Sequence, residues 1–508
     1  MGLLNRRAKV AAAENNTTNT TVAEKPAATA ATAANGSSSA PSNDGLLPQY
    51  NHNGHEVTQG IHPDGESGRR GVHPIAMLKI VWKSSCTASS WVNVLWPFVP
   101  AAIALHFIKG DHHLWTFAIN YIAMVPCANL LGFTGQELAR KLPKVAGILI
   151  ETTLGSVVEI VLFMVLIAKD DGTGAIGHGN KIVVIQAAIL GSILTNLLLC
   201  LGCCFLIGGL VNKEQKFHAV ISEAGSGLML VAGFALMIPS AFFSSLRGST
   251  VPEGEEGYTA TRLRSDTLNI SHGVSIILIV AFLLYLAYNA LSHDNIFQEV
   301  LEADEEADLD RHRDLKKAKL TLTECVVAIG LALALISLIA VFLVEEIEFV
   351  VENGVPDNFL GLILVPLVEK AAEHLTAIDE AYDNQINFAL YHCLGPSIQT
   401  ALFNAPLVVI VGWGLGKPMD LNFEIFMVVL LVLSILVVGN FLRDGSSNYL
   451  EGGLLMVVYI IIALTAWYYP NAELTTSNGL SGGTESDGGG EGNGTEALVH
   501  VAKMLMRT

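Results

Sequence analysis

The chain repeatedly contains long stretches that are almost free of charge, and these stretches limit its fold more than any other feature. Examples are residues 91–107, 219–239, 326–344 and 425–441. Each is near or above the length that an α-helix needs to cross roughly 30 Å of hydrocarbon. Charged residues make up only 15% of the chain, against about 25% in a soluble domain. The sequence therefore predicts an all-α polytopic membrane protein.

Apolar runs separated by charged or Gly- and Pro-rich loops predict about eleven transmembrane helices. They begin near residues 91, 113, 143, 181, 219, 268, 319, 356, 386, 421 and 449. If the N-terminus is cytosolic, most basic loop residues lie on the cytosolic side, as the positive-inside rule expects. These residues are Arg140, Lys141, Lys144, Lys213, Lys216 and the cluster from Arg311 to Lys319. An odd number of spans then places the C-terminus in the lumen, where Asn493-Gly-Thr495 matches a glycosylation sequon.

The same pattern divides the chain into six segments. They are a disordered cytosolic N-terminal arm (1–75), a first transmembrane span (76–112), a five-helix repeat (113–295), an acidic and basic cytosolic linker helix (296–318), a second five-helix repeat (319–470) and a low-complexity tail (471–508). The arm lacks the apolar core of a signal peptide, and its histidines (His52, His55, His62 and His73) favour a solvated linker over a metal site. The linker either is solvated and pairs with itself or has a regulatory or cation-attracting role at the cytosolic mouth. The net charge of -18 argues against nucleic-acid binding.

Two pairs of segments indicate an internal repeat. TTLGSVVEIVLFMVLIAK (152–169) precedes VVIQAAILGSILTNLLLCLG (183–202), and VEKAAEHLTAI (368–378) precedes ALYHCLGPSIQTALFNAP (389–406). Each pair joins a helix with a mid-membrane Glu to a helix with Gly, Ser and amide side chains. Five spans follow the first span and five follow the linker, so corresponding helices cross in opposite directions, which is typical of inverted repeats with a site near the midplane. The small residues beside each acid predict broken helices that line a cavity, with tight helix packing as the alternative.

Glu159 and Glu373 are the predicted central charged residues, because a carboxylate at the bilayer centre is costly and by default functional. Oxygen ligands suit a hard cation such as Ca²⁺. The candidate cation ligands are Glu159, Glu373, Ser192, Asn196, Ser397 and Gln399. Two acids in one dehydrated cavity hold either protons or a cation, and this exclusion is the physical basis of antiport. The candidate proton-coupling residues are Glu159, Glu373 and His374.

Four further segments carry a resemblance to a known family: AAEHLTA (371–377), SIQTALFNAPLVVIVGW (397–413), MDLNFEIF (419–426) and SSNYLEG (446–452). From about residue 113 to 470 the chain resembles the Ca²⁺/H⁺ exchanger (CAX) family of the Ca²⁺/cation antiporter superfamily, and its fungal vacuolar members most. The resemblance implies eleven spans, an acidic helix after the sixth, and Ca²⁺ uptake into a vacuole or another acidic organelle. It matches Glu159, Glu373 and His374 to the family's repeat glutamates and histidine. It also matches Ser192, Ser397 and Gln399 to polar residues of the accompanying helices.

The chain departs from the family pattern at three residues that are expected to alter ion selectivity. Ser156 stands where the first signature has Asn, and Glu369-Lys370 replaces the Gly-Asn pair of the second. The ammonium of Lys370 either pairs with Glu373 and occupies the place of a bound cation, or pairs with Glu369 or Asp379, or points into an aqueous vestibule. Sequence alone leaves these side-chain directions open.

The predicted function is cation/proton antiport, above all Ca²⁺/H⁺ exchange driven by a proton gradient. The alternatives are transport of Na⁺, K⁺ or Mn²⁺, and a non-transporting regulatory membrane protein in which Lys370 replaces the bound cation. An enzyme is not expected, since no HExxH or GxSxG motif is present. No cofactor is expected, and the expected partners are the transported cation, protons and the lipid bilayer, with the oligomeric state open.

Three cysteines, Cys200, Cys203 and Cys204, form a CxxCC cluster on one apolar helix. Such a cluster offers soft metal ligands, but the sequence shows no second ligand cluster nearby. Buried structural thiols are therefore the preferred interpretation.

Overall fold

The computed structural model describes residues 50–469, apart from residues 52–53, 59, 109–111, 171–180, 253, 255 and 310. The first 49 residues of the predicted arm, His52, and the predicted tail with its sequon lie outside the described residues. The described residues are almost all helical. The one sheet among them is a short antiparallel pair, β1 (Glu214–Lys216) with β2 (Ser446–Asn448).

The two repeats each contain five helical segments in chain order. In the first repeat these are α5 (His113–Ala139), α6 (Lys144–Lys169), α7 (Lys181–Leu194) continued by η3 (Thr195–Cys200) and α8 (Leu201–Asn212), α9 (Ala219–Leu246), and α10 (Ala260–Ala287) continued by η5 (Tyr288–Ser292). In the second they are α13 (Leu322–Glu345) with α14 (Ile347–Glu352), α15 (Asp357–Phe359) continued by η6 (Leu360–Leu364) and α16 (Val365–Tyr382), α17 (Ile386–Gln399) continued by η7 (Thr400–Asn404) and α18 (Ala405–Gly414), α19 (Ile425–Phe441), and α20 (Tyr449–Tyr468).

Shorter helices precede and join the repeats. The helices before the first repeat are α2 (Pro74–Lys83), α3 (Thr87–Val92) and α4 (Phe98–Phe107), with short 3₁₀ turns η1 (Pro63–Gly65) and η2 (Asn93–Leu95). The linker holds α11 (Asp294–Ala307) and α12 (Arg311–Asp314). Two further 3₁₀ turns are η4 (Arg247–Ser249) and η8 (Leu442–Asp444). The predicted linker helix is therefore two helices, an acidic one and a short one that begins with Arg311.

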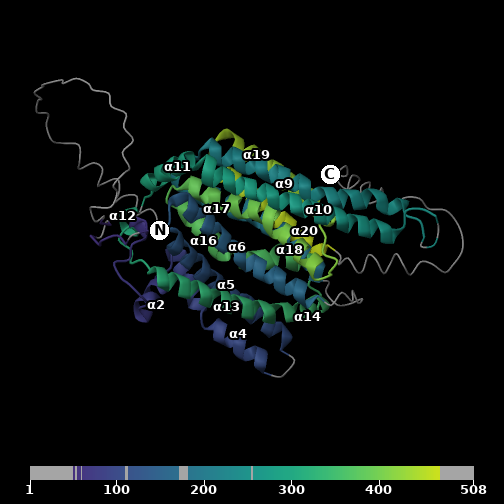
Figure 1. Ribbon diagram of the computed structural model, residues 1–508, viewed down its shortest axis with the longest axis horizontal. Helices are drawn as coiled ribbons and strands as arrows, with labels where there is room; N and C mark the ends of the chain where they lie inside the picture. Colours follow the sequence, from purple (N-terminus) through teal and green to yellow (C-terminus); the bar gives the residue numbers. More distant parts are fainter. Residues whose placement is uncertain are drawn as a thin grey trace, which may run out of the picture. The chain divides into compact units, whose positions relative to one another are not determined.

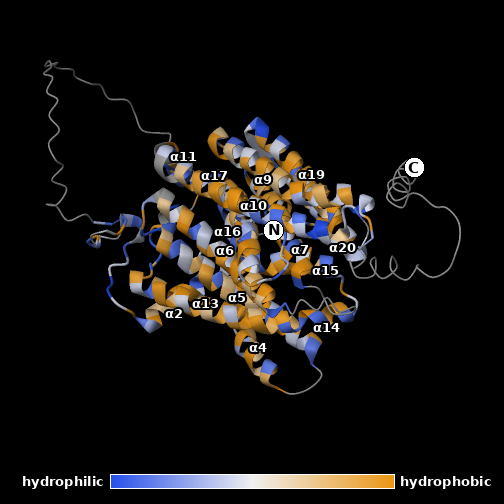
Figure 2. Ribbon diagram, turned by 45° about the vertical axis from the view of Figure 1, so that its right-hand side comes forward, coloured by the Kyte–Doolittle hydropathy of each residue, from blue (hydrophilic) through white to orange (hydrophobic). Residues whose placement is uncertain are grey.

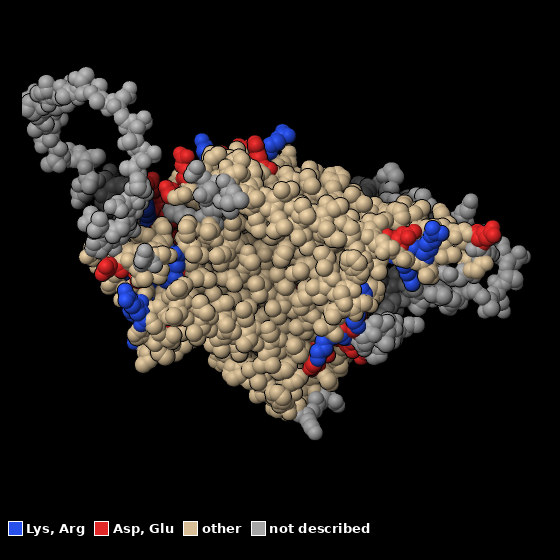
Figure 3. Space-filling model, in the orientation of Figure 1, with Lys and Arg blue, Asp and Glu red and all other residues tan. Residues whose placement is uncertain are grey.

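Ten helical segments in the described part of the chain are long and apolar enough to span a membrane. The eighth predicted span, α15 to α16, is not one of them, because Glu369, Lys370 and Glu373 lie in its middle. Apolar residues cover most of the length of the helices (Figure 2). Charged residues gather toward the two ends of the face in Figure 3 and leave a broad uncharged belt between them. The chain is an integral membrane protein, as the sequence predicted.

The helices that carry the two central acids lie in the middle of the bundle. Figure 1 shows α6, α16 and α17 between a layer that contains α5 and α13 and another that contains α9, α10 and α19. The repeats pack closely where α7 meets η6. A Cβ atom on Gly191 would lie 2.2 Å from the carbonyl oxygen of Leu362, and one on Gly361 would lie 2.6 Å from the Cβ of Ala187. These two glycines therefore set the separation of the repeats.

The structure differs from the predicted broken helices. The helix that begins at α7 continues through η3 into α8, and the helix that begins at α17 continues through η7 into α18. Both η3 and η7 are π-helical. A π turn changes the helical register without ending the helix, and such turns are frequent at functional sites. Small residues here favour a local widening of the helix over a break.

The structure describes most residues from 50 to 75, which the sequence analysis assigned to the disordered arm. The buried carboxylate of Glu324 at the start of α13 accepts hydrogen bonds from the backbone N–H of His73 at 2.9 Å and from Arg69 Nη2 at 3.3 Å. It also accepts the N–H of Thr321 at 2.9 Å, which completes a capping box. This carboxylate ties residues 69–73 to the second repeat.

Replacing Glu324 by Ala is expected to release this segment, because the substitution removes three hydrogen bonds and leaves the Arg69 guanidinium without its acid. A charged hydrogen bond of this kind contributes about 2 kcal/mol, so local opening becomes roughly 30-fold more frequent. Limited trypsin digestion after Arg69 and Arg70 measures this change. Glu299→Ala, which removes an exposed acid of α11, is the control and leaves the cleavage rate unchanged. Equal cleavage of both variants would contradict the anchoring role.

Candidate functional site

Glu159 lies near the middle of α6 and is completely buried. Its carboxylate accepts hydrogen bonds from Thr400 Oγ1 at 3.1 and 2.9 Å and from Asn404 Nδ2 at 3.1 Å. Both donors belong to η7 in the second repeat. The first-repeat acid is thus held by the second repeat, and its oxygens are oriented before any ion arrives.

The side chain of Lys370 lies between the two central acids. Its Nζ atom is 3.4 Å from Glu159 Oε2 and 3.5 Å from Glu373 Oε2. Lys370 and Glu159 are fully buried, whereas the Glu373 side chain keeps 18% of its surface exposed. The sequence left the direction of the Lys370 side chain open. In the structure, its ammonium lies between Glu159 and Glu373. Asp379 instead lines a cavity farther toward the linker.

Gly155 gives Glu373 the space to reach this position. A Cβ atom at residue 155 would lie 2.0 Å from Glu373 Oε1. Any side chain at this position of α6 would therefore displace the second-repeat carboxylate. Gly155 is therefore needed because it lets the two repeats approach closely. Its backbone conformation is one that other residues also adopt.

Four of the other candidate residues lie on the helices around this centre. Ser192 Oγ is 3.5 Å from Thr400 Oγ1, and His374 Nε2 is 3.0 Å from Asn196 Oδ1. Ser397, in contrast, donates to the backbone oxygen of Cys393 one turn earlier, at 2.8 Å. Ser192 is thus linked to Glu159 through Thr400, whereas the hydroxyl of Ser397 is used within its own helix.

Several buried polar atoms near the centre have no hydrogen-bond partner among the described residues. They are Ser156 Oγ, Asn196 Nδ2, Gln399 Nε2 and both carboxylate oxygens of Glu369. A buried polar group without a partner is costly. Water or a hydrated ion that enters the centre would complete the bonding of these atoms.

At each of the two π-helical segments, η3 and η7, side chains of one repeat form hydrogen bonds with the other repeat. Thr400 and Asn404 of η7 hold the acid of the first repeat, and Asn196 of η3 contacts His374 of the second. Thr400 and Asn404 were not among the predicted site residues. Their signal in the sequence was a pair of polar residues four apart in the apolar segment QTALFNAP. Sequence spacing does not show which acid they meet.

A cavity leads from the linker end of the bundle toward Glu373. Its outer part measures about 240 Å³ and is lined by charged, polar and apolar residues; the charged ones include Glu305, Arg311, Lys319 and Asp379. Burial lowers the pKa of Lys319, which lies outside the spans, to about 8. A smaller cavity of about 30 Å³ is lined by Gly155, Glu373 and Thr376. Both cavities are lined by Glu151, Thr376 and His392, so the smaller one lies next to the larger.

A charged cluster lies where the two cavities meet. His392 of α17 has its Nδ1 atom 2.7 Å from Glu380 of α16 and its Nε2 atom 3.4 Å from Glu151 of α6. The sequence analysis did not select these residues. They lie on three helices and on both repeats, which places a second ionisable group between the linker end and the central acids.

Comparison with known proteins gives consistent matches over the membrane part. A family model described as sodium/calcium exchanger protein matches residues 112–291 and 325–468. A vacuolar calcium ion transporter of Cryptococcus neoformans var. grubii is 30% identical over 76% of this chain and 75% of its own length. Vacuolar cation/proton exchanger 2 of Oryza sativa subsp. japonica is 30% identical over 80% of this chain and 90% of its own length.

Solved structures agree with this result. The chain in the crystal structure of the Ca²⁺/H⁺ antiporter protein YfkE is 25% identical in sequence to this chain. The match covers 74% of this chain and 98% of the YfkE chain. The TM-score of that comparison is 0.55. The two chains therefore share the arrangement of their helices as well as part of their sequence.

Proposed function

Because the chain belongs to the sodium/calcium exchanger protein family, we propose that it is a cation/proton antiporter that exchanges Ca²⁺ for H⁺. One observation carries the proposal: a carboxylate from each repeat lies within 3.5 Å of the same buried positive charge. A centre built in this way binds cations away from water. The names of the relatives, a vacuolar calcium ion transporter and a vacuolar cation/proton exchanger, support the choice of ion and the coupling to protons.

Ca²⁺ binds in this proposal where the ammonium of Lys370 now lies. A divalent ion at the same distance from the carboxylates gains about twice the Coulomb attraction of an ammonium. The displaced ammonium has an alternative partner in Glu369, whose carboxylate oxygens accept no hydrogen bond from the described residues. The proposed Ca²⁺ ligands are Glu159, Glu373, Ser192, Asn196, Ser397 and Gln399, with Ser156, Glu369 and Lys370 adjusting selectivity.

Protons take the place of Ca²⁺ in the other half of the cycle, with Glu159 and Glu373 as the groups that carry them. When Ca²⁺ leaves, the ammonium of Lys370 returns and balances one carboxylate charge, and protons neutralise the charge that remains on Glu159 or Glu373. His374 is proposed to assist, since its Nε2 atom meets Asn196 Oδ1 at 3.0 Å and couples the second-repeat acid helix to η3. The cavity at the linker end is the proposed path to the cytosol.

A second candidate is favoured by the position of Lys370. A tethered ammonium that never leaves Glu159 and Glu373 would block the centre, and the chain would then act as a non-transporting regulatory protein. The distances of 3.4 and 3.5 Å fit this role too. Exchange of Na⁺, K⁺ or Mn²⁺ is a third outcome, since the ammonium changes the charge that an ion meets.

We propose the vacuolar membrane as the location, with the linker end and the N-terminus in the cytosol and the C-terminus in the lumen. The vacuolar relatives support this address. An acidic lumen then supplies the protons that leave as Ca²⁺ enters.

The direct test is Ca²⁺ uptake into proteoliposomes that carry the full chain and an inside-acid pH gradient. Uptake that stops when a protonophore collapses the gradient supports Ca²⁺/H⁺ exchange. Parallel assays with Na⁺, K⁺ and Mn²⁺ identify another transported ion. Folded protein that moves none of these ions would favour the regulatory candidate.

Replacing Gly155 by Ala is expected to lower Ca²⁺ uptake by roughly tenfold, because a shift of about 1 Å at a reacting centre has effects of this size or larger. The new methyl group displaces the Glu373 carboxylate, which is the flexible end of a side chain, so the variant still folds. Gly330→Ala on α13 is the matched control, since a Cβ atom there meets no atom within 4 Å. Equal uptake by the two variants would contradict the need for close approach.

A further inference from the structure

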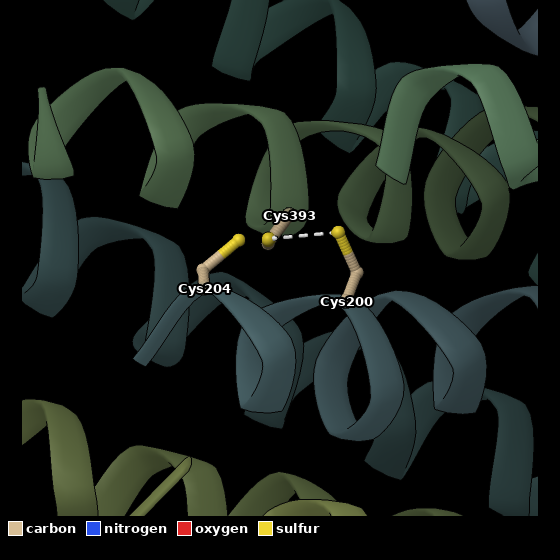
Figure 4. A group of neighbouring side chains, drawn as sticks. All are labelled: Cys200, Cys204 and Cys393. Atoms are coloured by element: carbon tan, nitrogen blue, oxygen red, sulfur yellow. Dashed lines mark hydrogen bonds between the residues drawn. The ribbon is translucent and has the colours of Figure 1, made fainter. Parts of the chain in front are cut away.

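Three buried cysteine sulfurs converge where the two repeats meet. Cys200 ends η3, Cys204 lies in α8 and Cys393 lies in α17. Their Sγ atoms all lie within 4.8 Å of one another, and Cys393 Sγ is 3.5 Å from Cys200 Sγ. Figure 4 shows the side chains of Cys200 and Cys204 pointing toward Cys393 across the gap between two helices. No more than 1% of any of the three residues is exposed.

The fold brings a sulfur ligand from outside the CxxCC motif, Cys393, next to two cysteines of that motif. Cys200 and Cys204 are four residues apart and share a helical face. Cys203, the third member of the CxxCC cluster, points elsewhere, with its Sγ atom 3.8 Å from Met456 Sδ. Cys393 completes the group from the opposite repeat, 193 residues along the chain from Cys200. Among the described residues this is the one group of three or more metal-ligating side chains that meets in this way.

We propose that Cys200, Cys204 and Cys393 form a binding site for a thiophilic metal ion such as Cu⁺. Sulfur ligands of an ion such as Zn²⁺ lie about 2.3 Å from it, so three of them around one ion are about 4 Å apart. The observed sulfurs lie within 4.8 Å of one another, so small side-chain movements bring them to that spacing. Thiolates select soft ions, whereas the oxygen ligands near Glu159 select hard ones.

Binding exchanges protons for metal without any redox change. The ion M forms three M–S bonds, and each S–H bond that breaks releases one proton to solvent. The group offers three sulfur ligands, whereas structural Zn²⁺ sites almost always have four ligands, so Cu⁺ is the better fit of the two.

The bound ion would join the repeats. Cys200 lies one turn beyond Asn196, and Cys393 lies one turn before Ser397, so the sulfurs lie on the same helices as the proposed Ca²⁺ ligands. Exchangers of this kind work by movement of one repeat against the other. Arrest of transport by the soft ion therefore rests on the proposed function, whereas the binding itself does not.

The test titrates the purified full chain, kept under reducing conditions, with Cu⁺ held by a coloured Cu⁺ chelator, and in a parallel arm with Cd²⁺. We expect the wild-type chain to take one more equivalent of Cu⁺ than Cys393→Ser at the same free Cu⁺. In the Cd²⁺ arm, ultraviolet thiolate-to-metal absorption is expected in the wild type and not in the variant. Cys204→Ser is expected to give the same loss. Cys127→Ser, which changes a buried cysteine of α5, is expected to bind like the wild type.

Two results would overturn the proposal: equal metal binding by wild type and both cluster variants, or an equal loss in Cys127→Ser. Monodisperse elution from size exclusion shows that each variant is folded. A separate measurement of Ca²⁺ uptake with and without Cu⁺ then shows whether the bound ion arrests transport. A chain that binds Cu⁺ but shows no uptake at all leaves the metal site standing and removes the proposed exchange.

Discussion

Ca²⁺ uptake is expected to fall by about 100-fold or more when Glu159 is replaced by Gln, since breaking a buried ion pair costs about 3–5 kcal/mol. The glutamine keeps an oxygen that accepts the hydrogen bonds of Thr400 and Asn404, so the local packing is retained. What the substitution removes is one of the two charges that face the cation. It also removes a proton site, and both halves of the exchange are lost together.

Glu373→Gln is expected to have an equally large effect, because the two acids lie at nearly equal distances from the same Lys370 nitrogen. Proteoliposome uptake with an inside-acid gradient measures both variants. Glu345→Gln is a suitable control, since that partly exposed acid pairs with Lys169 at the C-terminal end of α6, whereas Glu159 lies near the middle of that helix. Full activity in Glu159→Gln would show that the transported ion does not use this centre.

Lys370→Asn is expected to raise the apparent affinity for Ca²⁺ by about 10- to 100-fold, because a competing cation in the binding position is removed. The same substitution leaves Glu159, Glu369 and Glu373 close together without a counter-charge. Repulsion among buried carboxylates destabilises the fold unless a cation binds. The variant is therefore expected to unfold at a lower temperature in a Ca²⁺ chelator than the wild type, and Ca²⁺ is expected to reverse the difference.

Thermal unfolding with and without Ca²⁺, together with the uptake assay, tests this expectation. Lys181→Asn is the matched control, because Lys181 is also buried but pairs with Glu348. If wild-type chain transports no ion and Lys370→Asn does, the tethered ammonium is a permanent block and the regulatory candidate is correct. If Lys370→Asn shows no Ca²⁺-dependent stability, the ammonium does not stand in for a bound cation.

The positions of most membrane-spanning helices were predictable because length and charge are local properties of a segment. The predicted starts near 113, 181, 219, 386 and 449 coincide with the starts of helical segments. The first span was less regular than predicted, since α2, α3 and α4 are separate pieces. Proline and polar residues between them, such as Pro97, explain the interruptions.

The details of the centre were less predictable, because they depend on contacts between distant helices. Neighbouring residues on a helix point about 100° apart. The sequence therefore did not show that Lys370 faces Glu159, or that Glu369 accepts no hydrogen bond from the described residues. Thr400 and Asn404 gained their role from a π turn, which sequence periodicity does not show. Cys393 joined Cys200 and Cys204 only because the two repeats pack together.

The charged middle of α15 to α16 has a consequence for the biosynthesis of the chain. A Lys or Asp at the centre of a helix adds about 2.5–3.5 kcal/mol to its insertion into the bilayer, and this helix carries three charged residues there. By itself, this helix is expected to insert poorly into the bilayer. It becomes stable in the membrane once Glu159 of the first repeat meets Lys370. The order of synthesis, first repeat before second, therefore gives the late helix a ready partner, and a second repeat made separately is expected to leave this helix outside the bilayer.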